Sequence, residues 1–414
     1  MKKKTTIGEL CTLINGHGFS KAVWSESGLP IIRIQNLNGS RQFNYFDGEI
    51  EDKWLVEEGD LLYAWAGVVG VSFGPCLWNG PRGLLNQHIF RIVPNDGVDR
   101  RYLYAALEYE TRKIERKSHG FKSNFVHIRR SDLTDAAIRK FSPRYQKAIG
   151  VILGEVDNQL LQARRTESLR VARKAGLMRN LLSGRGRSER MRTDDLVSIN
   201  QSNLTETTNV DHQLQYLDVS AGKSDDPLSE LETLSFGDAP SRARRLVKRN
   251  DVLFSTVRPH LGGHFAVAET PCNLVASTGF AVMTPNEGEH TGFIEALVQS
   301  ERFLRLVMSR ATGSNYPAIS ASDLASIRIS IPDCKKRRAD IGQLSQLLDR
   351  EISLLRKLKA AIEEQKRGVM ERLLSGEVTI PDDVVERLNA EAEAEERGRD
   401  KDAEQTKSVC EKAS

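Results

Sequence analysis

The chain has 414 residues, of which 39% are hydrophobic and 28% charged, and its formal net charge is +4. This composition is typical of a folded protein with more than one domain, and no apolar run approaches the roughly 20 residues that a membrane-spanning helix needs. The five cysteines show no C-x-x-C spacing, and the basic start of the chain is not followed by the apolar segment of a secretory signal. We therefore expect a cytoplasmic protein without a metal site.

The sequence repeats itself at an offset of 191 to 192 residues. VEEGDLLYAWAG, which begins at Val56, matches VKRNDVLFSTVR, which begins at Val247. Ser-Asp-Leu at 131–133 matches the same three residues at 322–324, and LLSG occurs twice, 192 residues apart. Because the matches keep the same order along the chain, we predict two copies of one unit of about 190 residues.

The first part of each copy predicts a globular domain. Residues 1–142 hold short β-rich runs separated by Gly, Pro and Asn, and a helical pattern follows over 100–117. Residues 185–331 show the same pattern of short β-rich runs, and a helix is predicted over 291–310. The β-rich runs are LPIIRIQNL, DLLYAWAGVVGVSF and HIFRIVP in the first copy and HQLQYLDV, DVLFSTV and FAVMTP in the second. Short strands mixed with helices favour an α+β domain.

Each copy then continues into a long helical pattern. We predict spacer helices over 143–184 and 332–376, each beginning at a proline and ending at a glycine. Apolar residues occupy a shared heptad phase, with Ile149, Ile152, Val156, Ala163 and Leu177 in the first helix and Ile341, Leu344, Leu348, Leu355, Leu358, Ile362 and Val369 in the second. The shared phase predicts that the two helices pack on each other as a coiled coil.

The direction of the helices follows from their length. A helix of about 40 residues is about 60 Å long, whereas a domain the size of 185–331 has a radius of gyration of about 15 Å. Such a domain does not bridge 60 Å, so the helices should be antiparallel. The predicted fold is α+β, with two similar globular domains separated by a pair of long antiparallel coiled-coil helices. Residues 377–414 carry 12 acidic and 6 basic residues and predict a disordered tail or a frayed helix.

Catalytic motifs are absent from the sequence. It holds no G-x-x-x-x-G-K-[ST] loop for ATP phosphates, no Asn/Asp-Pro-Pro-aromatic motif of an amino-methyltransferase, and no H-x-x-x-H pair. The stretch PDCKK at 332–336 lacks a second carboxylate at the spacing of a nuclease metal site, and we interpret it as a helix start. We therefore expect a protein that is not an enzyme.

Local basic runs suggest contact with nucleic acid. SRARRLVKRN at 241–250 holds five basic residues, and 112–130 holds seven with one acidic residue. Such runs can be solvated surface, or they can bind phosphates and release counterions. Arg, Lys, Asn and Gln on loops are the residues that reach base edges. The candidate DNA-binding residues are Arg33, Gln35, Asn36, Lys122, Asn124, Arg242, Arg244, Arg245, Lys248, Arg258, His260, Asn315 and Tyr316.

A family resemblance joins these features. INGHGFSKAVWSESGLPIIRIQNLNG resembles the opening of a target recognition domain, and Gly-Asp-Leu-Leu at 59–62 and Ser-Asp-Leu at 131–133 match later parts of the family pattern. Two such domains, each followed by a helix ending in LLSG, resemble the specificity subunit of bacterial and archaeal type I restriction–modification systems over residues 5–380. The second copy departs from the pattern, with Asn250 in place of the glycine and no Pro-x-x-Gln at its helix start.

The resemblance implies a non-catalytic subunit that recognises a bipartite DNA sequence, with one half-site per domain. It implies two methyltransferase subunits and restriction/translocase subunits as partners, with S-adenosylmethionine, ATP and Mg²⁺ bound by those partners and no cofactor bound by this chain. From the residues alone, a stand-alone DNA-binding regulator or scaffold with a duplicated domain is the alternative. An enzyme with an unrecognised site is a third hypothesis.

Overall fold

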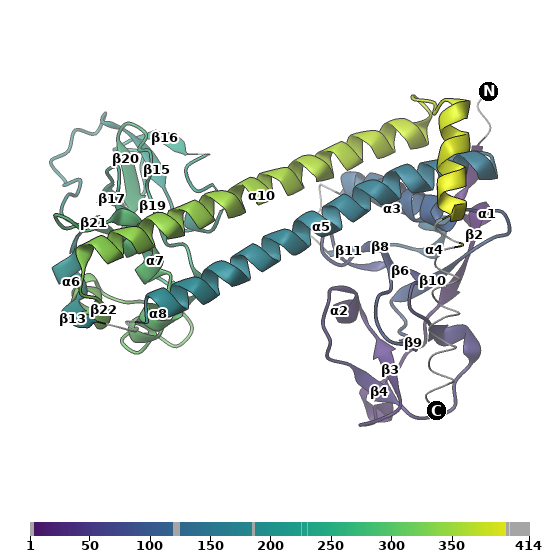
Figure 1. The fold of residues 1–414 in the computed structure, drawn as a ribbon, viewed down its shortest axis with the longest axis horizontal. Helices are drawn as coiled ribbons and strands as arrows, with labels where there is room; N and C mark the ends of the chain where they lie inside the picture. The colour runs from purple at the N-terminus through teal and green to yellow at the C-terminus, as the bar shows by residue number, and fades with distance from the viewer. Residues whose placement is uncertain are drawn as a thin grey trace. The chain divides into compact units, whose positions relative to one another are not determined.

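The computed structural model describes residues 4–118, 125–183, 187–224, 226–229, 231–394 and 397. The chain folds into two compact units, Met1–Gln162 with Ala360–Ser414, and Ala163–Lys359. The long helices α5 (Pro143–Leu181) and α10 (Lys335–Ser375) each contribute residues to both units (Figure 1). Within the described ranges, no helix is both long and apolar enough to cross a lipid bilayer.

The first unit is built on two four-stranded sheets. One is antiparallel, in the order β2 (Cys11–Asn15), β10 (Ile89–Pro94), β6 (Leu61–Ala64), β8 (Gly74–Leu77). The other has the order β4 (Asn44–Phe46), β3 (Leu29–Ile32), β9 (Gly83–Leu85), β5 (Leu55–Val56), with β3 and β9 parallel. Short pairs join β1 (Lys4–Thr6) to β12 (Ala137–Arg139) and β7 (Ala66–Val68) to β11 (Phe125–His127). The helical elements are α1 (Ile7–Leu10), η1 (Lys21–Val23), α2 (Ile34–Leu37), η2 (Asp52–Trp54), α3 (Arg100–Ser118) and α4 (Arg130–Thr134).

The second unit repeats this topology. One sheet has the order β14 (Val197–Ile199), β21 (Phe280–Pro285), β18 (Val252–Ser255), β19 (Phe265–Ala266). The other has the order β16 (Glu232–Ser235), β15 (Gln213–Leu217), β20 (Leu274–Ser277), β17 (Ala243–Leu246), with β15 and β20 parallel. A short pair joins β13 (Ser188–Arg192) to β22 (Arg328–Pro332). The helical elements are α6 (Thr193–Leu196), η3 (Ala221–Lys223), η4 (Pro259–Leu261), α7 (Thr291–Val298), α8 (Glu301–Met308) and α9 (Ala321–Ser326). The same strand order, with one parallel pair at the same place, confirms the duplication.

The turn before β6 and β18 shows how the second copy tolerates its change of sequence. Gly59 has φ 85° and Asn250 has φ 71°, so both lie in the left-handed region. Asparagine enters this region more easily than other side-chain-bearing residues. The carboxylates of Asp60 and Asp251 each accept a hydrogen bond from the backbone N–H three residues earlier, at 2.9 and 2.7 Å. The Gly-to-Asn change therefore preserves the turn.

The starts of the two copies match at a different offset. The backbone N–H of Ile7 donates to Ala136 O at 3.1 Å, and that of Thr193 donates to Ile327 O at 2.9 Å. The acceptors are 191 residues apart and the donors 186. The second copy therefore holds five more residues than the first between these points, so the offset of 191 does not extend to the starts of the two copies.

Within each unit α5 and α10 run antiparallel. In the first unit, Lys366 of α10 binds Asp157 of α5 at 2.6 Å. In the second unit, Lys174 of α5 binds Asp349 of α10 at 2.5 Å, an equivalent pair with the two helices exchanged. The partners' residue numbers add to 523 in both pairs. Charged pairs with this register favour one alignment of the helices over a slip by a turn.

Three expectations about the helices need correction. Pro332 is the last residue of β22, and α10 begins only at Lys335. The single helix expected over 291–310 is two helices, because Ser300 accepts a hydrogen bond from Phe303 N–H at 3.2 Å and caps the second. Of the expected heptad residues, Leu344 and Leu358 are exposed, at 36% and 51%.

The tail is partly helical, and its helical part packs on the core of the first unit. Residues 382–394 form a helix, drawn in yellow beside the start of α5 in Figure 1. Ile380 and Val385 are buried in the core of the first unit, and Arg144 binds Glu386 at 2.7 Å. The apolar residues recur at helical spacing, so this acidic segment still has one face that can be buried. Residues 395–396 and 398–414 lie outside the described ranges.

Candidate nucleic-acid interface

Two loops of the second unit meet beside the end of β18. One runs from Thr256 through η4, and the other follows α8. The N–H of Arg258 donates to Pro317 O at 2.7 Å, and the N–H of Ile319 donates to Thr256 O at 3.0 Å. A bridge between Val257 and Ala318 completes the junction. Backbone hydrogen bonds therefore hold both loops to the rigid end of a buried strand.

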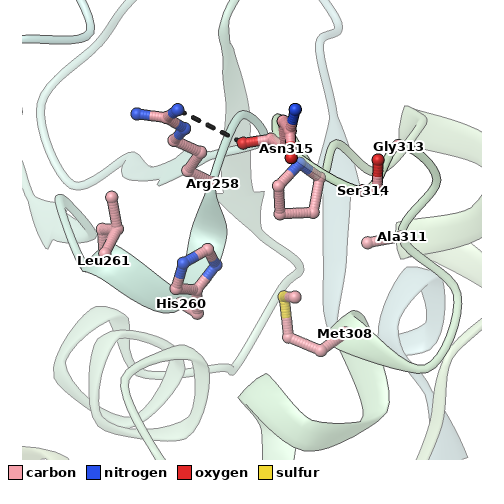
Figure 2. A pocket seen from close by; sticks show the side chains of 9 residues that line it. Arg258, His260, Leu261, Met308, Ala311, Gly313, Ser314 and Asn315 are labelled. Carbon is pink, nitrogen blue, oxygen red and sulfur yellow. Dashed lines mark hydrogen bonds between the residues drawn. The ribbon is translucent and has the colours of Figure 1, made fainter.

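This junction brings four predicted residues together. Arg258, His260 and Asn315 line a hollow of about 530 Å³, which Figure 2 shows from close by. The guanidinium carbon of Arg258 lies 4.0 Å from the ring centroid of Tyr316, and its Nη2 donates to Asn315 O at 3.2 Å. Tyr316 itself is 67% exposed. A cation stacked on an exposed aromatic ring beside a hollow is suited to an anionic or base-bearing ligand.

The ring of His264 holds the first of these loops through two hydrogen bonds to the backbone. Its Nδ1 accepts a hydrogen bond from Ser255 N–H at 3.1 Å, and its Nε2 lies 2.9 Å from Pro259 O. The ring is buried and stacks on Phe254 with centroids 4.1 Å apart. Burial lowers the pKa of His264 to about 4, so the ring stays neutral, with Nε2–H as the donor. No sequence pattern points to this role.

The position of His264 makes the second unit sensitive to acid. Because the folded-state pKa is about 4 and the ordinary value is 6.5, the unfolded chain binds the proton first as the pH falls. The stabilisation is complete above pH 6.5 and is lost between pH 6.5 and 4, by up to about 1.4 kcal/mol per pH unit. Urea unfolding at several pH values measures this slope. His264→Gln should reduce it, whereas His260→Gln, at an exposed ring in the same loop, should leave it unchanged. Equal slopes in all three chains would contradict the assignment.

The basic run of the second unit begins beside the same junction. Arg242 O accepts from Thr278 N–H at 2.8 Å, and the next residue, Gly279, accepts from Thr256 N–H at 2.9 Å. The chain at Arg242 and the Arg258 loop therefore flank one turn. Arg242 and Lys248 have exposed side chains. The charge of Arg242 adds to that of Arg258 at this junction, whereas Lys248 lies past the other end of β17, at the turn before β18.

Arg244 and Arg245 lie on β17, at the edge of its sheet, and are engaged within the protein. Arg244 stacks on Phe236, at 4.8 Å from the ring centroid, and donates to the carbonyl of Ala243 at 2.9 Å. Arg245 donates to Asn203 Oδ1 at 2.7 Å, and its Nε is buried without a hydrogen-bond partner among the described residues. Burial lowers the pKa of Arg245. These two arginines are less free to bind phosphate than Arg242.

The first unit contains the equivalent junction. The N–H of Trp65 donates to His88 O at 3.3 Å, and the N–H of Ile128 donates to Trp65 O at 3.1 Å, matching the bonds of Thr256 and Ile319 at an offset of 191. The Trp65 ring packs against His127 at 4.7 Å and His88 at 5.2 Å. Its Nε1 is buried without a partner among the described residues. Sequence reasoning did not select these three aromatic side chains, although the 191-residue offset from Thr256 identifies Trp65.

Two of the remaining predicted residues of the first unit, Lys122 and Asn124, lie outside the described residues. Arg33 binds Asn44 Oδ1 at 3.0 Å and lies over the Trp24 ring at 5.2 Å. Gln35 is exposed and donates to Gln42 O at 3.3 Å.

Asn36, another predicted residue, has its side chain engaged within its own segment of the chain. Its side chain is buried, and Oδ1 accepts from Arg33 N–H at 3.0 Å. Nδ2 donates to Ser40 O and Gln42 O at 3.0 and 2.9 Å. The amide therefore holds the loop after α2 in shape.

In the described part of the chain, no three His, Cys, Asp or Glu side chains are grouped so that they could hold a metal ion. What the junctions offer instead is non-covalent contact through guanidinium, amide, imidazole and aromatic groups. In both units these groups are mounted on loops at strand ends. Such loops, held by a rigid scaffold, are where binding residues concentrate in proteins.

Comparisons with known proteins agree with this geometry. The model of the family described as "Type I restriction modification DNA specificity domain" matches residues 2–170. The chain is 21% identical over 355 residues to the type I restriction enzyme MjaVIII specificity subunit of Methanocaldococcus jannaschii, covering 79% of this chain and 80% of that protein. It is 26% identical over 131 residues to the HindI specificity subunit of Haemophilus influenzae, covering 31% and 28%. The crystal structure of a type I restriction–modification S subunit from M. genitalium has a similar fold, with a TM-score of 0.55 at 14% identity, covering 92% of this chain and 96% of that one.

Proposed function

Since this chain belongs to the family of type I restriction–modification DNA specificity proteins, we propose that it binds double-stranded DNA at a bipartite target, with one half-site per domain. The observation that carries the proposal is the duplicated loop junction, held in both units by the same backbone hydrogen bonds around Trp65 and Thr256. One junction per domain supports one half-site per domain. A stand-alone regulator or scaffold is not favoured by the comparisons.

The two junctions differ in chemistry, which supports two different half-sites. Ala66 pairs with His127 as Val257 pairs with Ala318, so Gly67 is the counterpart of Arg258. At the parallel strand pairs, the residue after Ile32 is Arg33, whereas the residue after Leu217 is Asp218. Positive charge is therefore exchanged for neutral or negative side chains at matched positions. Domains with unlike side chains at matched positions should read unlike bases.

Exchanging a domain tests this division of labour. Replacing residues 1–142 by their counterpart from a related subunit should change one half-site and leave the other intact. The target of each assembled complex is measured by sequencing methylated DNA. The reciprocal exchange of residues 185–331 is the matched control and should change the other half-site. If one exchange altered both half-sites, the domains would not read independently.

We further propose that the chain does not catalyse a reaction itself and directs methyltransferase and restriction subunits to the DNA. The supporting feature is a row of exposed leucines on α10, Leu347 (60%), Leu354 (67%) and Leu358 (51%). Spacings of seven and four residues place them on one helix face. Exposed apolar rows of this kind are usual at protein–protein interfaces. S-adenosylmethionine, ATP and Mg²⁺ would then be bound by the partner subunits.

Replacing the leucine row tests the partner proposal. Leu347→Ser with Leu354→Ser should weaken binding of the methyltransferase subunit at least tenfold. The interface loses two buried leucine side chains, each of which contributes about 1.5–3 kcal/mol to the free energy of binding. Binding is measured by analytical ultracentrifugation of the mixed subunits. Lys357→Ser, at an exposed residue of the same helix, is the control. DNA binding by the isolated chain should be unchanged, and undiminished assembly of the double variant would contradict the proposal.

The exposed basic residues predict a measurable salt dependence. Arg242→Ala with Lys248→Ala should weaken binding to all DNA sequences alike, because each lost phosphate contact removes about one unit from the slope of log K against log salt. Fluorescence anisotropy between low and moderate salt measures the slope. Arg179→Ala, which removes an exposed charge from α5, is the control and should leave the slope unchanged. Equal slopes in wild type and double variant would assign the run to solvated surface.

A further inference from the structure

We propose that Arg258 reads a guanine in the half-site bound by the second domain. This inference rests on the proposed function, and it assigns a base to a particular side chain. The evidence is the way the guanidinium is held and the chemistry around it. In addition, Arg244 and Arg245 are already bound within the protein.

The guanidinium of Arg258 is held in a defined plane. It stacks on Tyr316 at 4.0 Å, and Nη2 donates to Asn315 O at 3.2 Å. Stacking on an aromatic face leaves the edge of the guanidinium, which carries the N–H donors, free to point outward. Figure 2 shows one terminal nitrogen turned toward Asn315 and the other turned away from it. Of the five N–H donors of an arginine, this one bond uses a single hydrogen.

The backbone of Arg258 is unusual for a residue with a side chain. Its φ is 51° and its ψ is 51°, in the left-handed region. This conformation is unfavourable for a residue with a β-carbon, which approaches the following carbonyl oxygen. Pro259, which follows, and the hydrogen bond from Arg258 N–H to Pro317 O hold the loop in place. Strain of this kind at an exposed loop is typical of sites where a side chain must be aimed.

The surroundings of Arg258 suit a base edge better than a phosphate. Val257, Leu261 and Tyr316 are exposed by 39%, 49% and 67%. An apolar rim excludes water and gives a phosphate nothing to bind, whereas bases offer flat faces and methyl groups to such a rim. Arg242 and Lys248 supply exposed charge elsewhere in the same unit.

Guanine matches the donors that Arg258 presents. In the major groove it offers two neighbouring acceptors, O6 and N7, which a guanidinium engages together. Adenine at the same position offers N7 but presents a donor where guanine has O6, so it cannot accept both bonds. A bidentate contact of this kind discriminates by about 1–3 kcal/mol, which corresponds to roughly 5- to 150-fold in affinity.

Selection from a pool of DNA duplexes tests the inference with the full chain. Wild type, Arg258→Lys and Tyr316→Ala are each used to select from the pool, and the enriched sequences are compared. Lysine keeps the charge but lacks the planar fork and the stack on Tyr316 that hold two donors in one plane. We expect Arg258→Lys to lose the preference for one guanine in one half-site and to keep every other position. Tyr316→Ala should lower the same preference by releasing the side chain, while Tyr316→Phe, which keeps the stack, should retain it.

A base analogue gives an independent readout. Replacing that guanine by 7-deazaguanine removes the N7 acceptor and should weaken wild-type binding by roughly tenfold. The same replacement should weaken Arg258→Lys less than twofold, because the contact is already lost. Equal weakening of both chains, or an unchanged motif for Arg258→Lys, would overturn the assignment while leaving the proposed function standing. A wild-type chain that selected no motif at all would contradict the proposed function itself.

Discussion

Replacing Glu289 with alanine is expected to destabilise the second unit by about 3–5 kcal/mol, the cost of leaving a buried charge without its partner. Arg338, at the start of α10, and Glu289 are 2% and 3% exposed in their side chains. Arg338 donates to Glu289 through Nε at 3.0 Å and Nη2 at 2.6 Å, and its Nη1 donates to Glu189 at 3.0 Å and to the Pro332 carbonyl at 2.7 Å. The alanine variant keeps the guanidinium buried but removes its two-pronged partner.

Thermal and urea unfolding of the full chain measure this loss. Glu301→Ala is the matched control, since it removes the same charge from a pair with Arg179 in which both side chains are more than two-thirds exposed. Exposed pairs contribute about 0–1 kcal/mol, so the control should unfold close to wild type. Replacing Arg338 with Met and Glu289 with Leu together should recover much of the loss, because no buried charge is then left unpaired. Glu189, the other partner of Arg338, is 43% exposed in its side chain and can be solvated. Equal unfolding of Glu289→Ala and Glu301→Ala would show that the buried pair does not anchor the start of α10.

Much of the architecture could be predicted because the duplication left an ordered trace in the sequence. The matches at 191 residues fall at the turn before β6 and β18, and at the Ser-Asp-Leu segments of α4 and α9, where local geometry restricts the residues. The trace fails at the start of the copies because of the five additional residues between Thr193 and Ile327. Apolar periodicity alone could not show that Ser300 splits a helix, because the break comes from a local cap on Phe303 N–H. It could not show which core the apolar face of the tail packs against, because that depends on tertiary contacts.

The candidate site was predicted less completely, for a reason visible in Asn36 and Arg258. Both are polar loop residues, and the sequence does not distinguish a side chain that bonds its own loop from one that faces a hollow. Asn36 satisfies backbone groups, whereas Arg258 is stacked on a residue 58 positions later. His264 was missed because its role is to hold the backbone of Ser255 and Pro259. The domain boundaries at 142, 184, 331 and 376 stay predictions.

The last expected result concerns the gap between the half-sites. Inserting four residues between Thr166 and Glu167 of α5, and four between Arg356 and Lys357 of α10, should lengthen each helix by about 6 Å. The antiparallel register makes these two points opposite, since Glu167 binds Arg356 at 3.0 Å. The double insertion therefore leaves the pairs Lys174–Asp349 and Asp157–Lys366 in register. Four residues also form a shift that a heptad seam absorbs by local unwinding.

If the helix pair sets the distance between the domains, the longer pair should prefer a longer gap. Two base pairs rise about 7 Å along DNA, at 3.4 Å each, so the variant should keep both half-sites and prefer a gap longer by one or two base pairs. Selection from duplexes with fixed half-sites and variable gaps measures this preference. The control is insertion in α5 alone, which moves one set of ion pairs out of register by a turn and should reduce specific binding at every gap. A double insertion that kept the original gap with undiminished affinity would show that the helices do not set the gap between the half-sites.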